Sequence, residues 1–235
     1  MIPKIIHYCW FGGNDKPKMV IDCINSWKKF MPDYEIIEWN ESNFDVNCND
    51  FVKMAYEKKK WAFISDFCRL FALFNYGGIY MDTDVEVLKS FDPLLNHNFL
   101  CYEQDEYICT AVMGFEKGSL FLKEFMDKYK SECFNLSKPN SKHLYEFLRD
   151  KISIPKNINL CFEGKDILFL TSDYFSPKDY VTKKLCITNN TYSIHHFDGS
   201  WKDSKSKLKD RMQNLGIKFL GKDRYYLLKN KFLKK

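Results

Sequence analysis

Short apolar segments alternate along this chain with longer segments in which apolar residues recur at helical spacing. Between residues 51 and 75, Phe63, Phe67, Leu70 and Phe74 recur at i, i+4, i+7 and i+11, the spacing of one buried helix face. Helices are therefore expected at 17–30, 51–75, 119–130 and 141–149. Strands are expected at 4–11, 34–39, 79–81, 99–103 and 109–115, which are short, β-prone and bounded by turn residues.

This order of elements predicts an α/β sheet with its ligand site at the carboxyl ends of the strands. Gly77-Gly78 ends the longest predicted helix, and the strand 79–81 then leads directly into Asp82-Thr83-Asp84. The region 150–195 predicts short strands and loops. We expect one catalytic domain over residues 1–201, with 202–235 as a basic helical extension packed on or beside it.

Composition supports a folded domain of an ordinary kind. Hydrophobic residues make up 45% of the chain and charged residues 29%, which excludes a disordered protein. No apolar run approaches the roughly 20 residues of a membrane span, and the N-terminus lacks the pattern of a signal peptide, so we expect a cytoplasmic protein. The nine cysteines include no CxxC pair and are expected to be free thiols in a reducing compartment.

Basic residues gather at the end of the chain, in the segment 202–235. This segment is either a solvated helix or a peripheral contact to the inner face of an anionic membrane. It matches no nucleic-acid-binding motif, so nucleic acid is not an expected partner.

Asp82 and Asp84 are the first candidates for catalysis. Two carboxylates one residue apart in extended chain can face the same way. Such oxygen ligands suit Mn²⁺ or Mg²⁺, which neutralises the diphosphate of a leaving nucleotide. A polar turn after a strand has the same sequence, so the pair needs support from elsewhere in the chain.

Two further groups supply that support. Asp66 and Arg69 are spaced i, i+3 on one helix face, where they form either a surface ion pair or contacts to a nucleotide. Far downstream, the heptapeptide 195–201 (HHFDGSW) holds two imidazoles, which are competent ligands for Mn²⁺. The other interpretation of the heptapeptide is a capped turn with a core tryptophan.

Together these groups resemble a known family. Residues 65–85, SDFCRLFALFNYGGIYMDTDV, resemble the signature of glycosyltransferase family 32. The opening 2–13, IPKIIHYCWFGG, is similar to the first strand of that family, and HHFDGSW resembles its closing element. The motifs occur in the order of the family, and the clostridial glucosylating toxins are similar at a greater distance.

The resemblance implies a GT-A fold, a Rossmann-like mixed sheet flanked by helices around one nucleotide-sugar site. It implies that Asp82 and Asp84 are catalytic, and that Asp84 and His196, with Asp82 beside them, hold Mn²⁺ or Mg²⁺. Contacts to the nucleotide and donor sugar are implied for Trp10, Ser65, Asp66, Arg69, Tyr80, Asp82, Ser200 and Trp201. Trp10 among them would stack on the base.

The reaction it implies is transfer of a hexose with retention of anomeric configuration. The donor is expected to be a UDP-hexose first and GDP-mannose second, and the acceptor a growing capsule or lipopolysaccharide oligosaccharide on a lipid carrier. Thr110 stands where relatives often carry Asn, which leaves the sugar preference open. Glu103, Asp105 and Glu106 form either a solvated loop or contacts to sugar or acceptor.

Three other functions fit some of the same residues. One is a protein-glycosylating effector related to the toxins, and the second is a non-catalytic module that binds nucleotide sugars. The third is a metal-dependent phosphatase, which the carboxylates alone would allow.

Overall fold

The computed structural model describes most of the chain. The described residues are 1–104, 107–131, 136, 138, 140–149, 151, 158–162, 167–199, 212, 213, 215–217, 219–221, 224, 225 and 227. Four residues singled out in the sequence lie outside them: Asp105, Glu106, Ser200 and Trp201. Most of the predicted extension 202–235 also lies outside the described residues.

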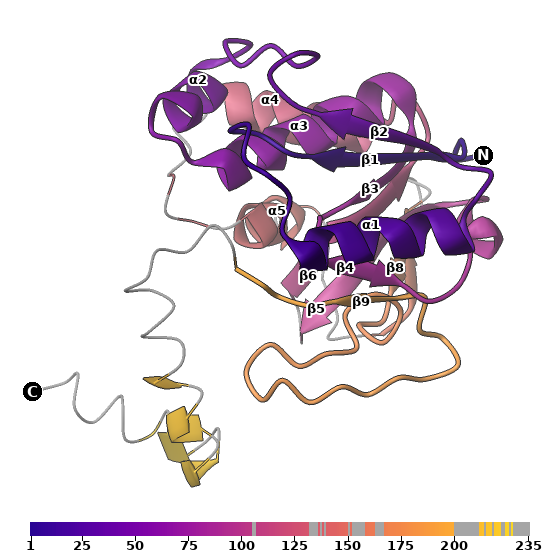
Figure 1. The fold of residues 1–235 in the computed structure, drawn as a ribbon, viewed down its shortest axis with the longest axis vertical. Helices are drawn as coiled ribbons and strands as arrows, with labels where there is room; N and C mark the ends of the chain where they lie inside the picture. Colours follow the sequence, from indigo (N-terminus) through magenta and orange to yellow (C-terminus); the bar gives the residue numbers. More distant parts are fainter. Residues whose placement is uncertain are drawn as a thin grey trace, which may run out of the picture.

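A seven-stranded mixed sheet forms the centre of the molecule, with strand order β2-β1-β3-β6-β5-β8-β7 (Figure 1). Its strands are β1 (Ile5–Cys9), β2 (Glu35–Trp39), β3 (Gly78–Met81), β5 (Asn98–Gln104), β6 (Tyr107–Phe115), β7 (Leu160–Phe162) and β8 (Ile167–Leu170). β6 and β7 run antiparallel to their neighbours, so β1, β2, β3, β5 and β8 all point the same way. The predicted α/β mixed sheet is confirmed, and the carboxyl ends of five strands share one edge.

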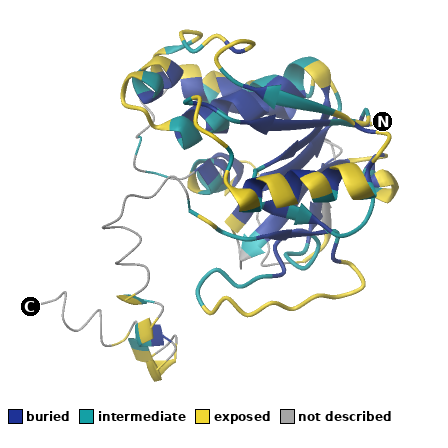
Figure 2. Cartoon of the chain, in the orientation of Figure 1, coloured by how far each residue is buried: buried dark blue, intermediate teal, exposed yellow. Residues whose placement is uncertain are grey.

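Helices cover both faces of the sheet, as predicted (Figure 1). They are α1 (Lys18–Phe30), α2 (Asp50–Glu57), α3 (Trp61–Tyr76), α4 (Leu120–Ser131) and α5 (Asn140–Arg149), with a short 3₁₀ turn at Asp92–Leu94. One apolar core lies between the sheet and α2 to α5, and a second lies between the sheet and α1. The central strands are buried between these layers, the edge strand β2 is partly buried, and the outer helix faces are exposed (Figure 2). No helix in the described part of the chain has the length and apolarity of a membrane span.

A small second sheet lies beside the first on the α1 side. It pairs β4 (Val85–Val87) with β9 (Ser193–His195) in antiparallel register, and α1 packs against β4. The sequence did not predict β4, because three residues flanked by polar ones give no readable period. This sheet joins two segments of the chain that lie far apart in sequence.

The single helix predicted over 51–75 is wrong, since the chain forms α2 and α3 with a break at Lys58–Lys60. Asn49 caps α2 by accepting a hydrogen bond from the Val52 amide. The break is made by Lys59, whose φ of 54° lies in the left-handed region. Without Gly or Pro in the segment, the sequence carries no signal for this turn; it is selected by packing of α2 and α4 against α3.

His7 on β1 ties three elements together inside the core. Its Nε2 lies 2.8 Å from the Gly77 carbonyl oxygen, and the Trp39 indole nitrogen donates to its Nδ1 at 3.1 Å. A carbonyl only accepts and an indole N–H only donates, so this geometry requires neutral His7 with its proton on Nε2. The imidazole therefore links β1 to β2 and to the junction of α3 with β3.

Candidate active site

The two aspartates of the DXD sequence lie at the carboxyl end of β3, in the middle of the shared sheet edge. β3 is buried throughout, and the Asp82 amide continues its ladder by donating to the Ala111 carbonyl at 2.8 Å. The chain then turns, with the Val85 amide donating to the Asp82 carbonyl at 3.1 Å. From α1, the Trp27 indole donates to the Val85 carbonyl at 2.7 Å, which fixes the far side of the turn.

The pairing of β4 with β9 brings His195 to Asp84. Val85 and His195 are register partners, and His195 Nε2 lies 3.5 Å from Asp84 Oδ1. The other carboxylate oxygen of Asp84 accepts a hydrogen bond from the Asp198 amide at 2.9 Å. His195 and Asp198 of the closing motif thus meet the DXD turn, as the resemblance implies for this motif.

Asp82, Asp84 and His195 form a group that fits a divalent cation. One ligand atom from each residue lies within 4.8 Å of the other two. Two carboxylate oxygens and one imidazole nitrogen are a donor set suited to Mn²⁺, and also compatible with Mg²⁺. Asp82 and Asp84 keep 29% and 15% of their side-chain surface exposed, so the group is reachable from solvent.

His196, the predicted third ligand, does not belong to this group. Its Nε2 lies 2.9 Å from Glu86 Oε2. Neighbouring side chains along a strand face opposite sides, and β9 ends at His195, so two consecutive histidines cannot both face Asp84 from extended chain. The correction is therefore one of register: His195 takes the place that the sequence analysis gave to His196.

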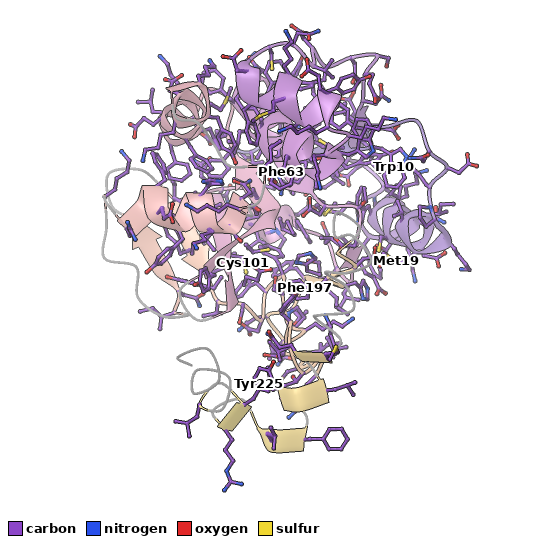
Figure 3. All side chains as sticks on the ribbon, turned by 90° about the vertical axis from the view of Figure 1, so that its left-hand side faces the viewer. Trp10, Met19, Phe63, Cys101, Phe197 and Tyr225 are labelled. Carbon is purple, nitrogen blue, oxygen red and sulfur yellow. The ribbon has the colours of Figure 1, made fainter. Side chains whose placement is uncertain are left out.

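The surroundings of His195 hold it in position. Its Nδ1 lies 3.9 Å from the Cys109 sulfur, and the ring of Phe197 packs on it at a centroid distance of 4.0 Å (Phe197 is labelled in Figure 3). Burial opposes a charge on His195, but Asp84 outweighs it and raises the histidine pKa well above its ordinary value. Burial likewise opposes ionisation of Asp84, and His195 with the Asp198 amide lowers its pKa to about 2.

Arg69 is buried behind Asp82 and connects α3 to the site. Its guanidinium donates to Asp66 Oδ1 at 2.8 Å and to the Thr110 carbonyl at 2.6 Å, and lies 3.4 Å from Asp82 Oδ1. It also stacks over the Tyr80 ring at 4.5 Å, while the Tyr80 hydroxyl donates to Asp82 Oδ1 at 2.9 Å. Arg69 and Tyr80 together hold the Asp82 carboxylate in place.

The alternative of a surface ion pair between Asp66 and Arg69 is wrong. Their side chains keep only 12% and 5% of their surface exposed. Burial raises the pKa of Asp66 to about 7, with the nearby Asp82 charge adding to it and Arg69 opposing it. Replacing a buried ion pair by two apolar residues often leaves stability unchanged, so stability alone does not explain this pair. We attribute it to the positioning of Arg69 beside Asp82.

The remaining predicted contacts lie along the same edge. Trp10 directly follows β1 and is half-buried; its indole donates to the Asn14 carbonyl at 2.7 Å, and Lys16 lies over its ring at 5.6 Å (Figure 3). The Ser65 hydroxyl donates back along α3 to the Trp61 carbonyl at 3.2 Å. The nucleotide contacts expected of Trp10, Ser65, Asp66, Arg69 and Tyr80 stay predictions.

Sequence reasoning missed three residues that shape this site. Trp27 and Cys109 contact it only through the folded sheet, and nothing local to either one signals this. Glu86 was missed together with β4, because its orientation away from the neighbours at 85 and 87 follows only once that strand is known.

The chain is similar to known proteins over the part that holds this site. Residues 17–100 match the family model described as the glycosyltransferase sugar-binding region containing the DXD motif. Inositol phosphoceramide mannosyltransferase 3 of Schizosaccharomyces pombe is 32% identical over 143 residues, which cover 59% of this chain and 40% of that protein. Alpha-1,4-N-acetylglucosaminyltransferase of Homo sapiens is 32% identical over 104 residues, which cover 43% and 26%. The chain thus spans less than half the length of these curated relatives.

Among solved structures, the PaToxG glycosyltransferase is similar with a TM-score of 0.49 and 18% sequence identity. The match covers 63% of this chain and 70% of that one.

Proposed function

We propose that this chain, which carries the DXD-containing sugar-binding region of the family 32 glycosyltransferases, transfers a sugar from a nucleotide-sugar donor to a hydroxyl of an acceptor. The resemblance to that family is confirmed by the match over residues 17–100. The observation that carries the activity is the convergence of Asp82, Asp84 and His195 at the carboxyl edge of the sheet. Open α/β sheets bind their ligands at this edge.

In this proposal Asp82, Asp84 and His195 hold a divalent cation. A bound Mn²⁺ or Mg²⁺ would neutralise the charge that develops on the diphosphate leaving group. Arg69 and Tyr80 keep the Asp82 carboxylate fixed, so the site pays little reorganisation when the substrate arrives. The acceptor oxygen forms a bond to the anomeric carbon, the bond from that carbon to the phosphate oxygen breaks, and the acceptor proton passes to the leaving phosphate.

The finer assignment is also a proposal. We propose a UDP-hexose as donor, GDP-mannose as second choice, retention of anomeric configuration, and a polysaccharide oligosaccharide on a lipid carrier as acceptor. The names of the two curated relatives include a mannosyltransferase and an N-acetylglucosaminyltransferase, so both kinds of donor belong in a test. The basic segment 202–235 supports a working place at an anionic membrane surface.

A screen of nucleotide sugars tests the activity. The full chain is incubated with Mn²⁺ and, in turn, UDP-glucose, UDP-galactose, UDP-N-acetylglucosamine and GDP-mannose, and free sugar is measured. Slow release of sugar from one donor, abolished by a chelator, is the expected result. Release of inorganic phosphate would instead favour a phosphatase, and metal-dependent binding with no turnover would favour a non-catalytic module.

Asp84→Asn tests the site itself. The variant keeps the size of the side chain but removes the charge at the metal group, so turnover should fall about 100-fold or more. Asp15→Asn, at an exposed position of the loop after β1, is the matched control and should keep full activity. Full activity of a folded Asp84→Asn variant would refute the metal assignment.

A further inference from the structure

Glu103 is an acidic residue at the sheet edge that the metal group does not use. It is the sixth residue of β5, near the carboxyl end, and β5 runs parallel to β3. Its neighbour two residues back, Cys101, pairs across the sheet with Cys109, which contacts His195. Glu103 therefore lies near the end of its strand, at the same sheet edge as the DXD turn.

The electrostatic interactions of Glu103 agree with this placement near the DXD turn. Asp82, Asp84 and His195 all act electrostatically on its carboxyl group. Burial raises the Glu103 pKa, the two aspartates raise it further, and His195 opposes them. Glu103 lies outside the group of ligand atoms within 4.8 Å, so it is a neighbour of the cation site and not a member.

Glu103 has no hydrogen-bond partner in the described part of the chain. Its side chain is partly buried, and among the described residues the one basic group that acts on its charge, His195, already lies against Asp84. A carboxyl group withdrawn from water and left unpaired beside two other carboxylates is unfavourable. A buried polar group that has no partner within the protein is typical of a binding site, where the ligand supplies the partner.

The order of strands indicates which part of a ligand lies there. Along the carboxyl edge, Trp10 follows β1, Asp82 follows β3, and Glu103 lies on β5, two strands further from β1. If the base lies by Trp10 and the diphosphate by the DXD turn, the next group along the edge is the transferred sugar or the acceptor. Glu103 is at that end.

We propose that Glu103 is a carbohydrate-binding residue that accepts a hydrogen bond from a sugar hydroxyl at the sugar end of this site. The inference rests on the proposed function, because it takes the ligand to be a nucleotide sugar or its acceptor. A carboxylate that accepts from a hydroxyl discriminates strongly against ligands that lack the hydroxyl. Glu103 would then contribute to the choice of sugar.

The experiment compares the wild type with Glu103→Gln and Glu103→Ala. Glu35→Gln on β2 is the matched control, since it removes one carboxylate at the opposite end of a strand of the same sheet. Three quantities are measured with Mn²⁺ present: the Kd of UDP, the Kd and hydrolysis rate of the UDP-hexose selected by the donor screen, and the KM of p-nitrophenyl hexosides as acceptors. Circular dichroism checks that each variant is folded.

Loss of a hydrogen bond to a charged group corresponds to about a 10- to 100-fold change. If the hydroxyl belongs to the donor, Glu103→Ala raises the Kd of UDP-hexose by that factor and leaves the Kd of UDP unchanged. If it belongs to the acceptor, donor binding and hydrolysis stay unchanged and the acceptor KM rises by that factor. In either case Glu103→Gln, which keeps an acceptor oxygen, recovers part of the loss.

Two results would overturn the inference. One is a folded Glu103→Ala variant with all three quantities within twofold of wild type, and the other is an equal weakening of UDP and UDP-hexose, which would assign Glu103 to the cation site. Failure of the proposed function has a different signature, because the wild type itself would then hydrolyse none of the donors.

Discussion

At the scale of single residues, the site depends on which of two adjacent histidines faces Asp84. The family resemblance implies that the closing motif meets the DXD turn, and the structure brings His195 and Asp198 of that motif to Asp84. The sequence does not predict the register, because adjacent residues in a strand exchange faces when the pairing shifts by one. The pairing of Val85 with His195 decides the matter, together with the adjacent pairs Glu86–Ile194 and Val87–Ser193 of the same short sheet.

Replacing each histidine in turn separates their roles. His195→Ala should raise the Mn²⁺ concentration for half-maximal donor hydrolysis at least about 10-fold, because it removes a ligand atom. His196→Ala removes only the contact to Glu86 and should change that concentration less than about threefold. Titrating Mn²⁺ against hydrolysis rate for both variants measures this. A larger effect at His196 would restore the original prediction.

At the scale of elements, most of the helices and strands were predictable and two features were not. The strand β3 and the aspartates after it follow from an apolar triplet stopped by polar residues. The break between α2 and α3 does not, since Lys59 is no helix breaker and adopts a left-handed conformation only because the fold requires it. The pair β4–β9 is also hidden, because a three-residue strand depends on its partner for stability.

Lys59→Gly should stabilise the protein. Glycine adopts a φ of 54° without the steric cost that a Cβ imposes, so the free energy of unfolding should rise by about 0.5–1 kcal/mol. Lys58→Gly is the matched control, since Lys58 has a φ of −88° and gains nothing from glycine. Urea denaturation of the three proteins measures the differences. Equal destabilisation by both glycines would show that Lys59 carries no strain.

At the scale of the whole molecule, the neutral imidazole of His7 links strands β1 and β2 to the junction between α3 and β3. Burial lowers the pKa of His7, against a smaller opposite effect of the Gly77 carbonyl. Protonation would place a second proton on Nδ1 and abolish the hydrogen bond from Trp39. β1, β2 and the α3–β3 junction are in contact through this ring, so its charge state affects the contacts among these elements.

His7 should therefore make stability depend on pH in a defined direction. Below pH 6.5, the ordinary pKa of histidine, the unfolded chain binds a proton that native His7 does not. The contribution of His7 to the free energy of unfolding is therefore present above pH 6.5 and is lost as the pH falls. Buried Asp66 has the opposite sign, since its folded pKa of about 7 favours the folded state at low pH. The test therefore measures the difference in free energy of unfolding between the wild type and a His7 variant, in which the effect of Asp66 cancels.

The stability advantage of wild type over His7→Gln should shrink by up to about 1.4 kcal/mol per pH unit below 6.5. Guanidinium unfolding at pH 7.5, 6 and 5 measures it. A difference that stays constant over this range would mean that His7 is not held neutral.

The basic segment 202–235 leads to a prediction on surface binding. The full chain should float with vesicles of phosphatidylserine and phosphatidylcholine, and much less with phosphatidylcholine alone, because each basic residue near an anionic surface adds about 1 kcal/mol. Lys229→Glu combined with Lys231→Glu should reduce flotation, whereas Lys28→Glu with Lys29→Glu on α1 should not. Equal loss with both pairs would indicate a general charge effect.

The pairing of β4 with β9 also sets the order in which the molecule can be built. Val85 and His195 are register partners although nearly half of the chain lies between them, so the contact forms late, after a long loop has closed. During synthesis the sheet strands from β1 to β6 can assemble while β9 is still within the ribosome. A growing chain would thus hold its two aspartates for some time before the histidine arrives, and the ability to retain a cation would appear only after His195 has left the ribosome.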